Sequence, residues 1–188
     1  MPGKSTFLKT VAINAILAQT INTCTADGYR APFYRIYSSM ALRDHLESGE
    51  SYYIVEIKAL KRILEEAEKI SGLPVLCFVD EVLRGTNTVE SIAASTQILK
   101  SLGKKQILCF AATHDIELTD LLDNYYLNYH FEEEVRDGDI FFPYRLFPGK
   151  ATTRNAIRLL ELIGYDETII TQANRMAEEF VENGYWKL

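Results

Sequence analysis

The chain has 188 residues, and its 20 Lys and Arg against 26 Asp and Glu give it a net charge of -6. A hydrophobic share of 47% with 24% charged residues excludes a disordered chain, and the acidic balance argues against a chain that binds a nucleic-acid backbone by itself. No apolar stretch approaches the ~18 residues that span a membrane, and three cysteines without a CxxC pairing (Cys24, Cys77 and Cys109) are typical of a reducing cytoplasm.

Two helices are predicted in the first part of the chain. Residues 6–21 are apolar nearly all round, which implies a buried helix. The second helix carries an apolar stripe at spacings of three and four, made of Ile57, Leu60, Leu64 and Ala67. Because strand-like segments follow, the pattern as a whole predicts an α/β sheet protein.

The middle of the chain predicts a parallel sheet with an antiparallel edge. Residues 75–79 and 107–112 are unbroken apolar runs of strand length, and a helical stripe over 92–102 lies between them. This order predicts a strand-helix-strand unit with parallel strands. Residues 127–131 alternate apolar and polar side chains, and with 140–146 they predict an antiparallel hairpin at the sheet edge.

The end of the chain predicts two amphipathic helices. One covers residues 156–163, and Asp166 can cap the second. Their apolar faces need a partner, so we expect a packing or dimerisation element. We therefore divide the chain into a core at 1–150 and a helical dimerisation element of the same domain at 151–188.

The first residues resemble half of a phosphate-binding loop. Gly3, Lys4 and Ser5 run directly into the first predicted helix. In such loops backbone N–H groups cradle the phosphates, the lysine reaches the β and γ phosphates, and the hydroxyl binds Mg²⁺. We expect Gly3, Lys4, Ser5 and Thr6 to bind a nucleotide. The first half of the loop and its strand would precede Met1, so we expect a chain truncated inside this loop.

Polar side chains also follow both predicted parallel strands. Asp80 and Glu81 come directly after residues 75–79, where an aspartate can help to hold Mg²⁺ and a glutamate can orient or deprotonate the attacking water. Either acid can instead cap the next helix. His114 follows residues 107–112 and can hydrogen-bond the γ phosphate or the water. Because these three candidate segments would meet at the carboxyl edge of the sheet, where the parallel strands end, we predict a nucleotide-hydrolysing site there. The other two histidines, His45 and His130, are interpreted as structural.

Two longer motifs identify a family. Residues 80–88 (Asp-Glu-Val-Leu-Arg-Gly-Thr-Asn-Thr), with Ala-Thr-His at 112–114, closely resemble the ATPase domain of MutS-type mismatch-repair proteins, in the ABC-type ATPase superfamily. Residues 44–56 are similar to that family's Asp-Asp-Leu-x-x-Gly-x-Ser-x-x-x-Val-Glu stretch. The resemblance covers almost the whole chain. It implies a P-loop α/β fold with a mostly parallel sheet flanked by helices, an antiparallel edge hairpin and a C-terminal helix pair.

The resemblance also implies roles and partners. Lys4 and Ser5 would hold phosphate and Mg²⁺, Asp80 would support the metal, Glu81 would act on the water, and His114 would match the family's switch histidine. The implied activity is that of a DNA-dependent ATPase, in which the ATP state is coupled to the binding of mismatched DNA by domains absent from this chain.

The implied assembly is a homodimer. Ser51 would match the serine that reaches the γ phosphate of the opposite subunit, although from the sequence alone it can equally be a loop hydroxyl. The terminal helices would pack across the subunit interface. No membrane contact is expected, and the implied compartment is the cytoplasm.

Some residues depart from the family pattern. His45 stands where a second Asp is usual, Leu83 replaces a Gly, and Pro2 stands where Gly or Ser is usual. Leu83 with Asn87 is similar to MutS-related proteins outside the core repair branch, which leaves mismatch recognition open. The alternative function is a truncated, catalytically silent dimerisation module. An ABC transporter or chromosome-structuring ATPase is disfavoured, because those families lack the Arg-Gly-Thr run at residues 84–86.

Overall fold

The structure is a computed structural model that describes residues 3–40, 52–69, 72–83, 87–103, 106–136, 139–151 and 156–185. The chain separates into two compact units. The first unit comprises Met1–Phe131 with Leu146–Lys150, and the second comprises Glu132–Arg145 with Ala151–Leu188. The candidate site residues that the structure describes all belong to the first unit.

A parallel sheet of three strands forms the centre of the first unit. Its order is β1 (Arg35–Ser39), β2 (Val75–Asp80) and β3 (Ile107–Ala112), and both neighbouring pairs are parallel. The helix α3 (Thr88–Leu102) connects β2 to β3. The predicted parallel strand-helix-strand unit is therefore confirmed, and β1 is a strand that the sequence patterns did not reveal.

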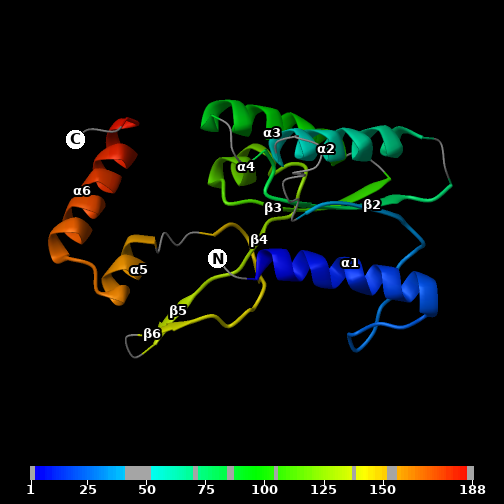
Figure 1. The fold of residues 1–188 in the computed structure, drawn as a ribbon, viewed down its shortest axis with the longest axis horizontal. Helices are drawn as coiled ribbons and strands as arrows, with labels where there is room; N and C mark the ends of the chain where they lie inside the picture. Colours follow the sequence, from blue (N-terminus) through cyan, green and yellow to red (C-terminus); the bar gives the residue numbers. More distant parts are fainter. Residues whose placement is uncertain are drawn as a thin grey trace. The chain divides into compact units, whose positions relative to one another are not determined.

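Helices cover both faces of this sheet (Figure 1). The face with Val75, Cys77 and Val79 packs against α3, α2 (Tyr52–Glu68) and α4 (Ile116–Leu121). The opposite face, with Leu76 and Phe78, packs against α1 (Lys4–Ile21). Because β2 is covered on both sides, every residue from 75 to 79 is buried, which explains its continuous apolar run.

The helices on the sheet bury narrower faces than the sequence suggests. In α1 the buried apolar residues are Leu8, Ala12 and Ala15, whereas Ile13 is 52% exposed. The expectation that this helix is buried all round is wrong, because α1 packs on the sheet along one face.

The buried face of α2 differs by one position from the predicted stripe. It consists of Glu56, Leu60 and Ile63, while Ile57 is 37% exposed. Leu64 and Ala67 are only partly buried at the edge of the core. A glutamate therefore occupies a core position of this helix.

Two short antiparallel pairs lie outside the parallel sheet. In the first unit, β4 (Tyr129–His130) pairs with β7 (Phe147–Pro148). In the second unit, β5 (Glu134–Arg136) pairs with β6 (Asp139–Phe141). An antiparallel hairpin is present as β5–β6, but the predicted pairing is wrong: residues 134–136, and not 127–131, pair with 139–141. The predicted first strand pairs instead with residues 147–148, through Tyr129 and His130.

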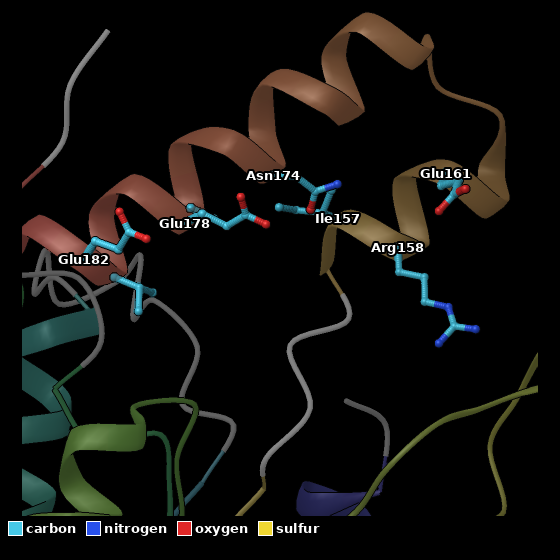
Figure 2. Close-up of a pocket in the computed structure, with 8 residues that line it drawn as sticks. Ile157, Arg158, Glu161, Asn174, Glu178 and Glu182 are labelled. Atoms are coloured by element: carbon cyan, nitrogen blue, oxygen red, sulfur yellow. The ribbon is translucent and has the colours of Figure 1, made fainter.

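The second unit also holds two terminal helices, α5 (Ala156–Ile163) and α6 (Glu167–Asn183). Asp166 caps α6, because its Oδ1 accepts a hydrogen bond from the Thr168 N–H at 2.8 Å. Figure 2 shows an open groove between the two helices, lined by side chains from both. In the part of the chain that the structure describes, no helix is long and apolar enough to cross a membrane.

Candidate functional site

The N-terminus of α1 lies beside the carboxyl end of β3 and has no side-chain cap among the described residues. The carbonyl of Gly3 accepts the first helical hydrogen bond, from the Phe7 N–H at 2.8 Å. Because Gly3 has no side chain, it cannot cap the helix with one. The first turn contains no acidic residue. The N–H groups at the start of a helix lack partners within the helix and carry a partial positive charge. This end of α1 therefore suits an anion such as a phosphate.

Gly3 occupies a position where a side chain is strained. Its φ is +122°, which side chains with a Cβ rarely adopt. A Cβ at this position would lie 3.1 Å from the Phe131 ring, tighter than ordinary contact. The ring of Phe131 also contacts that of Phe7 edge to face, at 6.2 Å between centroids. Phe131 therefore supports the turn from which α1 begins.

The lysine of the predicted loop reaches the end of β3. Lys4 Nζ donates a hydrogen bond of 2.6 Å to the main-chain carbonyl of Thr113. Thr113 immediately precedes His114 in the chain. The contact joins the start of α1 to the carboxyl end of the neighbouring strand, so two of the predicted segments lie next to each other.

The carboxylates after β2 meet the histidine after β3. Asp80 pairs with Ala112 in the sheet register, and the Glu81 N–H donates to the Ala112 carbonyl at 2.9 Å. The Glu81 Oε1 lies 2.7 Å from the His114 Nε2, and the two side chains are 24% and 43% exposed. Glu81 and His114 therefore form a pair that a ligand at the sheet edge can reach.

The turn after Asp80 has an uncommon backbone. Glu81 and Leu83 adopt left-handed conformations with φ of 60° and 54°. Such conformations cost free energy for residues with a Cβ, and they persist where the surroundings hold them. They are found often at active sites.

Three side chains from α2 and α3 form hydrogen bonds with the backbone of this turn. The Glu56 Oε1 accepts a hydrogen bond of 2.6 Å from the Leu83 N–H. Ser91 Oγ donates to the Leu83 carbonyl at 3.0 Å, and Ser95 Oγ donates to the Val82 carbonyl at 3.3 Å. The turn is therefore fixed by α2 on one side and by α3 on the other.

Glu56 is an acid in an apolar environment. Burial raises its pKa above the ordinary value, the hydrogen bond from the Leu83 N–H acts in the opposite direction, and the charge of Glu81 raises it further. The sequence patterns single out Glu56 only as the last residue of the stretch that resembles the MutS family. The available signal was a glutamate four residues before Leu60 on the buried face of the same helix.

The residues at the sheet edge suit Mg²⁺ and a nucleotide. The Ser5 hydroxyl and the Asp80 carboxylate are the hard oxygen ligands that Mg²⁺ prefers, usually together with phosphate oxygens and water. The turn at Gly3 is one that a Cβ would obstruct, and the start of α1 offers N–H groups to phosphate. Thr6 lies on the exposed surface of the first turn of α1.

Some predicted residues lie outside the described residues. They are Ser51, His45 and the Arg-Gly-Thr run at 84–86. His130 is described, and its Nδ1 lies 3.0 Å from the Gly149 carbonyl, in keeping with the structural role expected for it. The groove between α5 and α6 contains none of the predicted nucleotide-binding residues.

Comparison with known proteins identifies the family. Residues 1–181 match the family model described as MutS domain V. The chain is 30% identical over 177 residues to the DNA mismatch repair protein MutS of Thermus thermophilus, covering 94% of this chain and 21% of the relative. It is 31% identical over 188 residues to the DNA mismatch repair protein MutS of Lactobacillus acidophilus, covering 98% and 22%. The chain thus spans about a fifth of the length of the curated relatives that it matches. This chain belongs to the MutS domain V family.

Proposed function

We propose that this chain binds and hydrolyses ATP within a DNA mismatch repair or DNA-processing protein, and that its ATP state controls DNA binding by other domains. One observation carries the proposal. The uncapped start of α1 with Lys4 lies against the end of β3, where the Glu81–His114 pair also lies. The family match supports the link to mismatch repair, because the matched relatives are named DNA mismatch repair proteins.

The start of α1 binds the phosphates in this proposal. The N–H groups of its first turn surround them, and Lys4 exchanges its contact with the Thr113 carbonyl for one with a phosphate oxygen. Ser5 and Asp80 are the residues that would hold Mg²⁺. When bound with the nucleotide, Mg²⁺ would neutralise the negative charge on the phosphates.

Glu81 acts on the attacking water. The water oxygen forms a bond to the γ phosphorus, the bond to the oxygen bridging the β and γ phosphorus atoms breaks, and the carboxylate of Glu81 accepts the proton of the water. His114 holds the carboxylate through its contact at 2.7 Å and can turn to the γ phosphate. The products are ADP and inorganic phosphate.

The same proposal includes a homodimer. Ser51 would complete the site of the opposite subunit, and α5 and α6 would contribute to the interface. Neither helix has a buried residue in the described part of the chain, and Ile163 and Val181 are exposed. Exposed apolar side chains on a helix pair favour a protein partner. DNA would be bound by other domains.

Substitution of Lys4 tests nucleotide binding. In the whole protein that the gene encodes, Lys4→Met removes a charged donor to phosphate, which is worth about 1.5–3 kcal/mol. We expect the Kd for ATP to rise about 10- to 100-fold in calorimetry. Lys9→Met, on the exposed side of the same helix, is the matched control and should leave the Kd unchanged.

The result also separates the two candidate functions. Equal ATP affinity of Lys4→Met and wild type would remove the loop from the proposed site. A wild-type protein that binds no ATP, while it still dimerises, would favour the silent dimerisation module instead.

A further inference from the structure

Glu56 interrupts the apolar face with which α2 packs on the core. This face continues with Leu60 and Ile63, and the three side chains are 2%, 1% and 0% exposed. Leu60 and Ile63 belong to the same core cluster as Val82 and Leu83 of the turn after β2. A buried carboxyl group is costly unless it is hydrogen-bonded, so its place here calls for a function.

The contacts of Glu56 point to the turn that carries Glu81. One carboxyl oxygen accepts from the Leu83 N–H at 2.6 Å, and the other has no hydrogen-bond partner among the described residues. The bond is therefore directed at the backbone of the turn. Leu83 lies two residues after Glu81, and both have left-handed backbones.

The same turn is held on its carbonyl side by α3. Ser91 and Ser95 donate to the carbonyls of Leu83 and Val82, and Ser95 is fully buried. Glu56 supplies the acceptor to the amide of this turn. Without Glu56, the Leu83 N–H would lose its partner, and of these three side chains only Ser91 and Ser95 of α3 would still hold the turn.

We propose that Glu56 is a positioning residue, whose carboxyl oxygen holds the Leu83 amide and thereby keeps Glu81 paired with His114 at the sheet edge. The inference rests on the proposed function, in which Glu81 acts on the attacking water. In this role Glu56 acts through the backbone of the turn and does not itself contact the nucleotide or the attacking water. Its effect falls on the rate of hydrolysis and not on the binding of ATP, because the phosphate-binding start of α1 is built from other residues.

Two substitutions separate positioning from packing. Glu56→Gln keeps the acceptor oxygen and the length of the side chain, whereas Glu56→Leu keeps most of the volume and removes the acceptor. Both are measured in the whole protein that the gene encodes, beside wild type and Glu81→Gln. The readouts are kcat, KM and Kd for ATP, and hydrogen exchange of the peptide that covers residues 81–83.

We expect Glu56→Leu to lower kcat about 10- to 100-fold, since small misplacements of a catalytic group have effects of this size. Its Kd for ATP should stay within about twofold of wild type, and exchange at residues 81–83 should become at least about tenfold faster. Glu56→Gln should restore kcat to within about threefold of wild type and keep the amide protected, which a purely apolar packing role does not predict.

Each other outcome is decisive. Wild-type kcat in Glu56→Leu, with an inactive Glu81→Gln, overturns the inference and leaves the proposed function intact. A wild-type protein that hydrolyses no ATP overturns both. If Glu56→Leu does not fold, Glu56→Met replaces it; if neither folds while Glu56→Gln does, Glu56 is a stability residue and the positioning role is rejected.

Discussion

Gly3 combines a backbone angle and a close contact that both disfavour a side chain. Gly3→Ala places a Cβ on a residue with a φ of +122° and brings that Cβ to 3.1 Å from the Phe131 ring, and both features destabilise the folded state. We expect this substitution to lower the free energy of unfolding by about 1–3 kcal/mol, because strained backbone angles cost this much. Urea unfolding measures the change.

Gly28 provides the control for this prediction. A Cβ there would meet nothing within 4 Å, and its backbone lies outside the left-handed region. Gly28→Ala should change the free energy of unfolding by less than about 1 kcal/mol, with stabilisation through the unfolded chain as the favoured sign. Equal effects of the two substitutions would contradict the described turn at Gly3.

Glu56 makes stability depend on pH. Burial holds its pKa above the ordinary value of 4.5 in the folded state. Below that value the carboxyl is protonated in both states. As pH rises from 4.5, the unfolded chain releases this proton first, so the unfolded state binds fewer protons and the free energy of unfolding falls until the folded pKa is passed.

The control for this dependence is Glu56→Gln, which has no proton to release. Across the window that begins at pH 4.5, its free energy of unfolding should increase relative to wild type as pH rises, and the difference should level off above the folded pKa. Urea unfolding at several pH values measures it. If the difference in the free energy of unfolding between Glu56→Gln and wild type does not change with pH, the pKa of Glu56 is the same in the folded and unfolded states.

The site could be predicted from the sequence only in part. Lys4, Glu81 and His114 were identified because motifs at the start of a helix and at strand ends place side chains at one sheet edge. The bond from Leu83 to Glu56 could not be predicted, because it depends on how α2 packs beside a turn 27 residues further along the chain.

At the scale of elements, the buried face of α2 can be tested with two isoleucines. Ile63 is fully buried in the core, whereas Ile57 is 37% exposed. Ile63→Ala should lower the free energy of unfolding by about 2–5 kcal/mol, because it leaves a cavity. Ile57→Ala should cost less than about 1 kcal/mol. Urea unfolding of both variants compares the two positions directly, and the opposite order would restore the face predicted from the sequence.

The elements differ in how well the sequence predicts them. β2 and β3 were predicted within one residue, because continuous apolar runs of strand length are typical of parallel strands, although β3, unlike β2, is for the most part only partly buried. The predicted buried face of α2 was wrong by one position, because Glu56 is buried but counts as a polar residue in a hydrophobic periodicity pattern. β1 was missed, since its five residues, Arg-Ile-Tyr-Ser-Ser, carry few apolar side chains.

The sequence patterns also could not predict the pairing between short segments that lie far apart in the chain. β4 and β7 are two residues each, and their pairing joins parts of the chain separated by the β5–β6 hairpin. A Gly149 N–H bond to the Asn128 carbonyl at 2.8 Å extends this pairing. Contacts of this kind follow from the closure of the whole first unit and leave no local signal.

At the scale of the whole molecule, nucleotide chemistry and DNA binding are assigned to different parts in this account. The chain has a net charge of -6 and spans about a fifth of the length of its matched relatives. An acidic chain is poorly suited to a phosphate backbone, although a helix N-terminus and one lysine suit a single nucleotide. Coupling to DNA would therefore require other domains.

The most direct test of the central claim is the rate of Mg²⁺-dependent ATP hydrolysis by Glu81→Gln in the whole protein that the gene encodes. Removal of a group that accepts a proton from the water should lower kcat by at least about 100-fold, with little change in the Kd for ATP. Glu117→Gln, at an exposed glutamate in α4, should hydrolyse ATP at the wild-type rate. Wild-type kcat in Glu81→Gln would contradict the account.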